Sequence, residues 1–138
     1  MEISIVPTEH VESVWPVIEK YMEGAAVYTY GRFTAGDIKH ELLHTPNRQL
    51  WIAFDGAHIY GAVVTQIIVY PRMRALVMHF IGGDEGLKWK APMLEMLRRF
   101  ARDNECSVVE AIGRPGWAKI FGSDGLQKRS IFFEIPVE

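Results

Sequence analysis

The chain is poor in cysteine and has no excess of charge of either sign. Cys106 is the only cysteine among 138 residues, so neither an intrachain disulfide nor a zinc site of four cysteines can form. Fifteen Lys and Arg residues stand against 17 Asp and Glu residues, and this balance gives no field that could hold a nucleic-acid backbone. We therefore expect a reducing, cytoplasmic setting and no nucleic-acid partner.

Long apolar runs are also missing. No stretch approaches the roughly 18 apolar residues that a membrane-spanning helix needs, and residues 1–6 lack the basic region and apolar core of a secretion signal. The chain instead has dispersed apolar bulk, with 49% hydrophobic residues that include 7 Phe, 5 Tyr and 4 Trp. This composition excludes intrinsic disorder. It predicts one domain over residues 1–138 and no membrane contact.

Apolar spacing predicts ten elements along the chain. They are a strand near residues 3–6, helices at 14–22 and 35–44, strands at 49–54, 58–70 and 75–81, a long helix ending near residue 104, a strand at 106–112, a helix at 115–121 and a strand at 130–137. Thr34 and Asp37 resemble a capping box, and Asp55-Gly56 is a hairpin signal. The three middle strands predict an antiparallel meander, and the later strand–helix–strand unit predicts parallel strands. The expected fold is α/β, with a mixed sheet flanked by helices.

The end of the chain carries a family resemblance. Residues 117–122 read Trp-Ala-Lys-Ile-Phe-Gly, and residues 130–135 read Ser-Ile-Phe-Phe-Glu-Ile. Together with the order of elements, they resemble the GNAT (N-acetyltransferase) fold over almost the whole chain. Segments 30–34, 50–53, 70–72 and 113–117 are similar to small GNAT-like proteins of tailed phages and prophages. The resemblance implies a phage-encoded protein of the host cytoplasm or the virion.

The resemblance also implies a cofactor site for acetyl-CoA. In GNAT proteins the cofactor lies where two parallel strands separate, and backbone N–H groups of a loop and of the next helix hold its pyrophosphate. The residues implied here are Ile81, Gly82, Gly83, Gly86, Leu87, Lys88 and Ala91. The family's loop reads Arg/Gln-x-x-Gly-x-Gly/Ala, and only Ala91 matches it. Trp89 replaces the first glycine and is expected to crowd a pyrophosphate, and Asp84 and Glu85 are expected to oppose an anion.

The catalytic residues implied by the family are altered too. Its usual acid is a Tyr in the last helix, but no Tyr follows Cys106. Glu110 and His79, on expected neighbouring strands, are the candidate bases, and the alternative is that both are ordinary solvent-facing residues. Candidates for substrate or partner contact lie in the loop after the first helix and at the end of the strand at 106–112. They are Tyr28, Tyr30, Arg32, Arg114 and Trp117.

Residues 40–44 form a competing motif, His40-Glu41-Leu42-Leu43-His44. On a helix this spacing puts two imidazoles on one face, with a Glu that can polarise a zinc-bound water. Pro46 ends the helix soon afterwards, and the two His side chains fall on its polar side. A third ligand would have to come from a distance, with His58, Asp55 and Glu85 as the candidates. A solvated helix face is the alternative, and we expect no metal.

Three functions remain open from the sequence. The first is a GNAT-fold binding or accessory protein with a degenerate acetyl-CoA loop and weak or no acyl transfer. The second is an active acetyl-CoA-dependent N-acyltransferase with an altered loop, and the third is a zinc hydrolase. Expected partners are a protein or a small-molecule amine, and an open sheet edge would allow a homo-oligomer.

Overall fold

The computed structural model describes residues 1–113 and 115–137. Its strands form one sheet in chain order, from β1 (Glu2–Val6) through β2 (Arg48–Asp55), β3 (His58–Val69) and β4 (Arg74–Gly83) to β5 (Val108–Ala111). Each neighbouring pair from β1 to β4 is antiparallel, whereas β4 and β5 are parallel. The predicted meander and mixed sheet are therefore confirmed.

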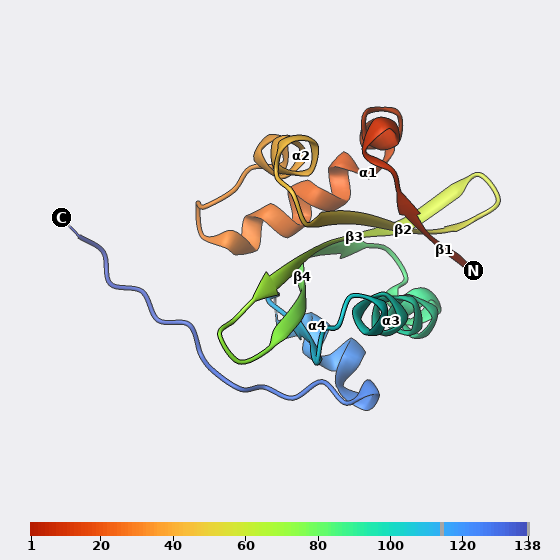
Figure 1. Cartoon of the computed structure of the whole chain (residues 1–138). Helices are drawn as coiled ribbons and strands as arrows, with labels where there is room; N and C mark the ends of the chain where they lie inside the picture. The colour runs from red at the N-terminus through yellow and green to blue at the C-terminus, as the bar shows by residue number, and fades with distance from the viewer. Residues whose placement is uncertain (114, 138) are drawn as a thin grey trace.

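Helices cover both faces of this sheet, as Figure 1 shows. Helices α1 (Val11–Ala26) and α2 (Ala35–His44) lie on one face, and α3 (Gly86–Asp103) and α4 (Pro115–Phe121) lie on the other. Each face has its own cluster of buried apolar side chains. No helix in residues 1–113 or 115–137 is long and apolar enough to cross a membrane.

Local sequence explains where α2 begins and how α3 packs. The Thr34 hydroxyl accepts a hydrogen bond from the Asp37 N–H (3.1 Å), and the Asp37 carboxylate accepts one from the Thr34 N–H (2.9 Å), so the predicted capping box is confirmed. Helix α3 turns one apolar stripe toward the sheet. The buried residues of this stripe recur at every fourth position, at Trp89, Met93, Leu97 and Ala101.

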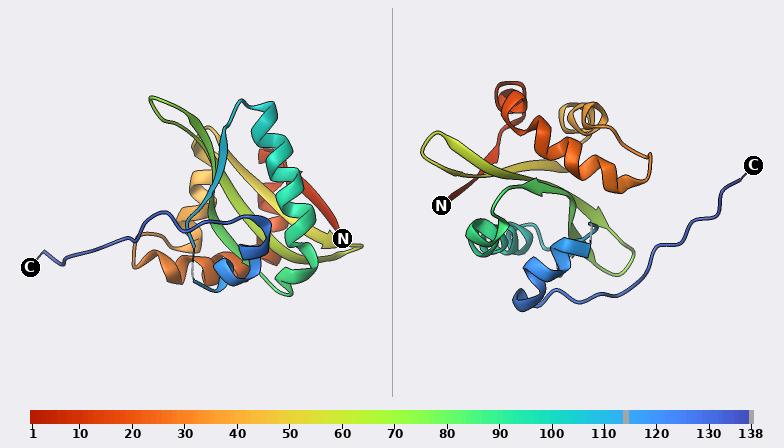
Figure 2. Two further views of the ribbon diagram at one scale, coloured as in Figure 1. Left: turned by 90° about the horizontal axis from the view of Figure 1, so that it is seen from below. Right: turned by 180° about the vertical axis from the view of Figure 1, so that it is seen from behind.

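The end of the chain differs from the prediction. The strand expected at residues 130–137 is not formed, and residues 126–137 form a C-terminal segment that pairs with no strand. The end of this segment projects from the body in all views (Figures 1 and 2). Its β-formers remain exposed, including Phe133 and Ile135. Strand propensity describes how well side chains suit a sheet, so without a neighbouring strand it does not produce one.

Helix α1 crosses β4 with almost no space between the two backbones. A Cβ added to Gly82 would overlap the carbonyl oxygen of Tyr21 on α1. The close approach brings the end of α1 and the end of β4 to the same cleft, which is described below. Gly82 is therefore required here for its lack of a side chain.

We predict that Gly82→Ala lowers the free energy of unfolding by roughly 1–3 kcal/mol, because α1 and β4 must move apart. Gly24→Ala is the matched control, since Gly24 lies in the same α1 and a Cβ there meets nothing within 4 Å. It should raise stability by roughly 0.5–1 kcal/mol. Urea unfolding followed by circular dichroism measures both, and equal stability of the two variants would contradict the proposed contact.

Candidate functional site

One unpaired residue in β4 lies at the site. Val64 pairs with Phe80 and Thr65 pairs with Met78, so His79 has no partner on β3 and forms a β-bulge. Pairing between β4 and β5 ends at Met78 and Ala111, and the last bond runs from the Ile112 N–H to the Met78 carbonyl (3.1 Å). Beyond it β4 continues without β5 beside it. The parallel strands therefore separate at the carboxyl end of β5, where α/β sheets bind ligands.

A cleft of about 930 Å³ opens at this separation. Its walls are the end of α1 and the turn that follows it, the end of β4, α4, and the C-terminal segment. Eight of the residues singled out from the sequence line it: His79, Ile81, Gly82, Gly83, Tyr28, Tyr30, Arg32 and Trp117. Gly86, Leu87, Lys88, Ala91 and Glu110 do not line it, and Arg114 lies outside the described residues. The structure thus gathers candidates that are far apart in the sequence.

The connection from β4 to α3 is short and acidic. It consists of Asp84 and Glu85 alone, and Glu85 takes a left-handed conformation (φ 54°). Asp84 lines the cleft and accepts a hydrogen bond from the Tyr21 hydroxyl (3.3 Å). Burial raises the pKa of Tyr21, and the Asp84 carboxylate adds to the rise. Both carboxylates stand beside the first turn of α3, where free N–H groups favour an anion.

The two lysines that follow are already paired. Lys88 lies 2.6 Å from the Glu85 carboxylate, and this contact raises the pKa of Lys88. Lys90 donates to the Ile120 carbonyl (2.9 Å) and contacts Asp124 (3.2 Å). Neither lysine lines the cleft. Lys88 offsets the charge of Glu85, and Lys90 is engaged with Ile120 and Asp124.

The expectation for Trp89 is wrong. Its side chain is fully buried, and its indole N–H donates to the Asp84 carbonyl (2.9 Å). The ring lies against Gly61, where an added Cβ would sit 2.6 Å from it. Because α3 begins at Gly86, Trp89 falls on the inner stripe of the helix and enters the core. The four-residue spacing between Trp89 and Met93 in the sequence indicates that both lie on the buried face of the helix.

His79 is held from three sides. A bulge places consecutive side chains on one face, and accordingly the His79 ring stacks on Phe80 (4.1 Å between centroids, 19° between planes). The Phe33 ring meets it edge-on at 5.5 Å. Arg48 Nη1 donates to His79 Nδ1 (3.3 Å), and Arg48 Nη2 lies 2.6 Å from the Glu41 carboxylate. Sequence reasoning missed Arg48, which lies 31 positions from His79 and belongs to no motif.

Glu110 has a different environment. It accepts a hydrogen bond from the Tyr70 hydroxyl (3.0 Å) on the exposed surface, and this bond raises the pKa of Tyr70. Of the two candidate bases, the structure brings only His79 into the cleft. Proton abstraction by Glu110 or His79 stays a prediction.

The structure separates the glutamate of the His-Glu-x-x-His motif from its two histidines. His40 and His44 are exposed, with ring centroids 4.4 Å apart. Glu41 turns away from them toward Arg48. Among the described residues, no three His, Cys, Asp or Glu side chains come together as a metal would require.

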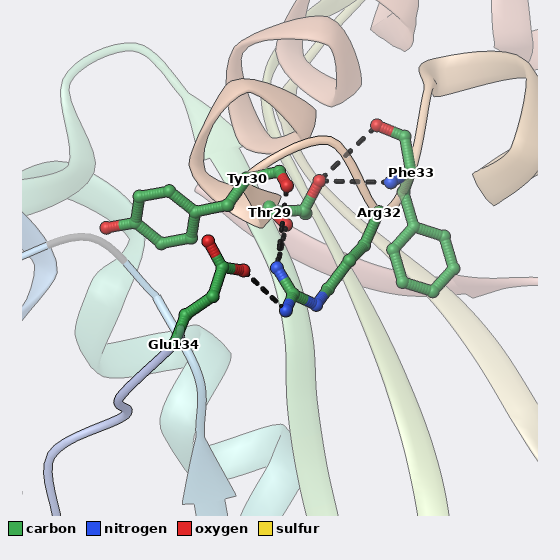
Figure 3. A network of polar contacts seen from close by, with 5 residues as sticks. All are labelled: Thr29, Tyr30, Arg32, Phe33 and Glu134. Carbon is green, nitrogen blue, oxygen red and sulfur yellow. Dashed lines mark hydrogen bonds and ion pairs between the residues drawn. The ribbon is translucent and has the colours of Figure 1, made fainter. Parts of the chain in front are cut away.

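Arg32 joins the loop after α1 to the C-terminal segment, as Figure 3 shows. Its guanidinium donates to the carbonyls of Thr29 and Tyr30 (3.4 Å each) and lies 2.6 Å from the Glu134 carboxylate. It also lies 5.0 Å from the centre of the Phe132 ring. Arg32, Phe132 and Glu134 all border the cleft, so these contacts place the C-terminal segment along its mouth.

Several known structures with this arrangement are described as acetyltransferases. No family model and no curated protein matches the sequence. A probable acetyltransferase is 14% identical with a TM-score of 0.73, covering 100% of this chain and 99% of its own. A ribosomal-protein-alanine N-acetyltransferase from Brucella melitensis biovar Abortus 2308 is 14% identical with a TM-score of 0.70, covering 99% of this chain and 100% of its own. A predicted acetyltransferase from Clostridium acetobutylicum, solved with acetyl-CoA, is 14% identical with a TM-score of 0.69, covering 98% and 95%.

The fold is that of the GNAT acetyltransferases. At such identities the likeness establishes the fold and leaves the chemistry to the site. Within this GNAT fold, the separated strands agree with the resemblance. The acidic connection before α3 departs from the loop that the resemblance implies.

The contacts that hold His79 in place, here called the clamp, are accompanied by a shift in the pKa of its imidazole. Burial lowers the pKa of His79 below its ordinary value of 6.5, Arg48 lowers it further, and Glu41 partly offsets the fall. Below pH 6.5 the unfolded chain therefore takes up a proton that the folded protein excludes, so His79 costs stability as the pH falls through this window.

We predict that Arg48→Met raises the pKa of His79, because it removes the neighbouring cation and leaves Glu41. Titration of the imidazole protons by NMR measures the midpoint. Arg99→Met is the control, since Arg99 pairs with Glu95 on the exposed side of α3. An unchanged midpoint in Arg48→Met would contradict the clamp.

Proposed function

We propose that this GNAT-fold protein binds a ligand in the cleft between α1, β4 and α4, but does not hold coenzyme A by its diphosphate. Acyl transfer from acetyl-CoA is then weak or absent, and the protein acts by binding. The observation that carries the proposal is the two-residue connection Asp84-Glu85. It puts two carboxylates where a cradle for the diphosphate would have to stand.

Electrostatics supports this proposal. Two like charges about 6 Å apart near a protein surface repel by roughly 3 kcal/mol at an effective dielectric constant of 20. That repulsion corresponds to a loss of affinity of roughly a hundredfold. Lys88 offsets part of the charge of Glu85, so Asp84, which lines the cleft, contributes most of this repulsion. Lys90 is engaged with Ile120 and Asp124. The space beside Gly86 is also occupied, since a Cβ there would lie 3.2 Å from Trp117 and 3.3 Å from Ile120.

A second candidate is acyl transfer from acetyl-CoA through a non-standard loop. The bulge at His79 and the separated strands favour it, because they leave a slot of the kind the family uses. The burial of Trp89 favours it as well, since this ring leaves the loop unobstructed. The two candidates differ in one measurable respect, which is affinity for the diphosphate part of the cofactor.

We predict that the wild-type protein shows no saturable binding of acetyl-CoA or coenzyme A in titration calorimetry up to millimolar concentration. The double variant Asp84→Asn/Glu85→Gln should gain affinity by roughly tenfold or more, because both like charges are removed. The asparagine side chain that replaces Asp84 can still accept the hydrogen bond from the Tyr21 hydroxyl through its amide oxygen.

Glu95→Gln is the matched control, because it removes one exposed carboxylate from α3, the helix that follows the connection, at a distance from the connection itself. It should leave acetyl-CoA binding unchanged. Stoichiometric binding of acetyl-CoA by the wild type, with transfer of the acetyl group to an amine, would refute the proposal and establish the second candidate.

Several narrower expectations remain predictions from the sequence. They are an origin in a phage or prophage, a place in the virion or the host cytoplasm, and a protein or amine partner. Association of two copies through an open sheet edge is another. The zinc hydrolase hypothesis gains no support, because Glu41 is committed to Arg48.

A further inference from the structure

Strand β5 forms one edge of the sheet, and this edge is open. In the part of the chain that the structure describes, β5 pairs with β4 alone. Soluble proteins commonly protect such an edge with lysine, proline or a covering element. Residues 108–111 read Val-Val-Glu-Ala, and the one charged side chain among them, Glu110, is engaged with the Tyr70 hydroxyl. The edge is therefore free to pair with another strand.

A hollow of about 390 Å³ lies beside this edge, between β5, α3 and the end of α4. It shares no residue with the cleft. Most of its lining is apolar and includes Leu94, Val109 and Phe121. Because side chains alternate between the two faces of a sheet, a strand added next to β5 would direct every second side chain toward this hollow.

The last residues of the chain have the pattern of a strand. Ile131, Phe133, Ile135 and Val137 alternate with Phe132, Glu134 and Pro136, which is the spacing of a strand with one apolar face. Of these alternating apolar residues, the last three are 83%, 87% and 99% exposed, and none of the three lines the cleft. Residues 130–137, here called the arm, thus carry an apolar face that is not buried in a single copy.

The arm starts close to the hollow of its own copy but does not enter it. Gly125 and Leu126 line the hollow, and the chain then runs to the mouth of the cleft, where Glu134 contacts Arg32. Beyond this contact its end projects from the body (Figures 1 and 2). The two charged side chains are 46% and 48% exposed, and an ion pair this exposed contributes little stability. The arm is therefore weakly held.

We propose that the arm of one copy pairs with the free edge of β5 in a second copy, and that the exchange is reciprocal. Each five-stranded sheet then gains a sixth strand, and the apolar face of the arm fills the hollow. One chain carries both the unpaired strand and the open edge, so two copies related by a two-fold axis supply what each lacks. Pairing also withdraws Phe132 and Glu134 from the mouth of the cleft. This inference does not depend on which ligand the cleft binds.

The first test is the mass of the 138-residue chain in solution. Sedimentation equilibrium over a wide range of concentrations should find monomers and dimers, with a dissociation constant in the micromolar range. Phe133→Lys and Ile135→Lys should each raise this constant roughly a hundredfold or more, because a symmetric dimer loses the buried side chain twice. Ile5→Lys is the matched control, since it puts the same charge on β1, the opposite edge strand, at a side chain that is 41% exposed. It should leave the constant unchanged.

A mixture of two variants identifies the contact. Val108→Glu places a charge on the open edge and should also give monomers. Mixed with Phe133→Lys, it supplies an intact arm to an intact edge, so native mass spectrometry should find heterodimers at concentrations where neither variant dimerises alone. Thermal melting confirms that each variant is folded. Isotope-filtered NOE spectra of labelled and unlabelled wild type give a second measurement, with contacts expected from Phe133 of one copy to β5 of the other.

A chain that stays monomeric at every concentration would overturn the proposal. NOE contacts between the arm and β5 within a single copy would do the same, because the arm would then complete its own sheet. A dimer that survives Phe133→Lys, a dimer that Ile5→Lys disperses, or a mixture without heterodimers would also refute the exchange.

Discussion

The single unpaired residue in β4 is the constraint on which the site depends. His79 has no partner on β3, and it directly follows Met78, the last residue of β4 that pairs with β5. The same irregularity turns the His79 ring to the face of Phe80 and Phe33. The bulge thus places a titratable ring at the point where pairing between β4 and β5 ends.

The two halves of the cleft are built by different means. The half beside β4 and β5 depends on backbone geometry, namely the bulge at His79 and the close approach at Gly82. The half beside α3 depends on charge, and there Asp84 and Glu85 oppose the positive end of the helix dipole that an anion would use. A fold can therefore be retained while its binding of one chemical group is lost. Agreement in fold and departure in the loop are compatible for this reason.

Much of the architecture followed from local sequence rules. The capping box of Thr34 and Asp37 and the Asp55-Gly56 turn are decided by residues next to one another. The closing strand at residues 130–137 failed because pairing needs a partner that no local pattern specifies. Trp89 stands at a glycine position of the loop that the resemblance implies, but its spacing of four to Met93 also puts it on the inner stripe of α3, and there its ring enters the core.

The site was harder to predict than the fold, because its key contacts join distant parts of the chain. No residue near Arg48 in the sequence indicates that Arg48 contacts His79, and in the sequence Glu41 stands out only as part of a metal-binding motif. In the structure, Glu41 faces away from His40 and His44 and fixes the guanidinium instead. A motif describes spacing along one helix, whereas the role of a carboxylate depends on which cation the fold brings to it. Here that cation, Arg48, contacts the His79 ring, so a residue expected in metal chemistry is linked to the cleft wall through a neighbouring strand.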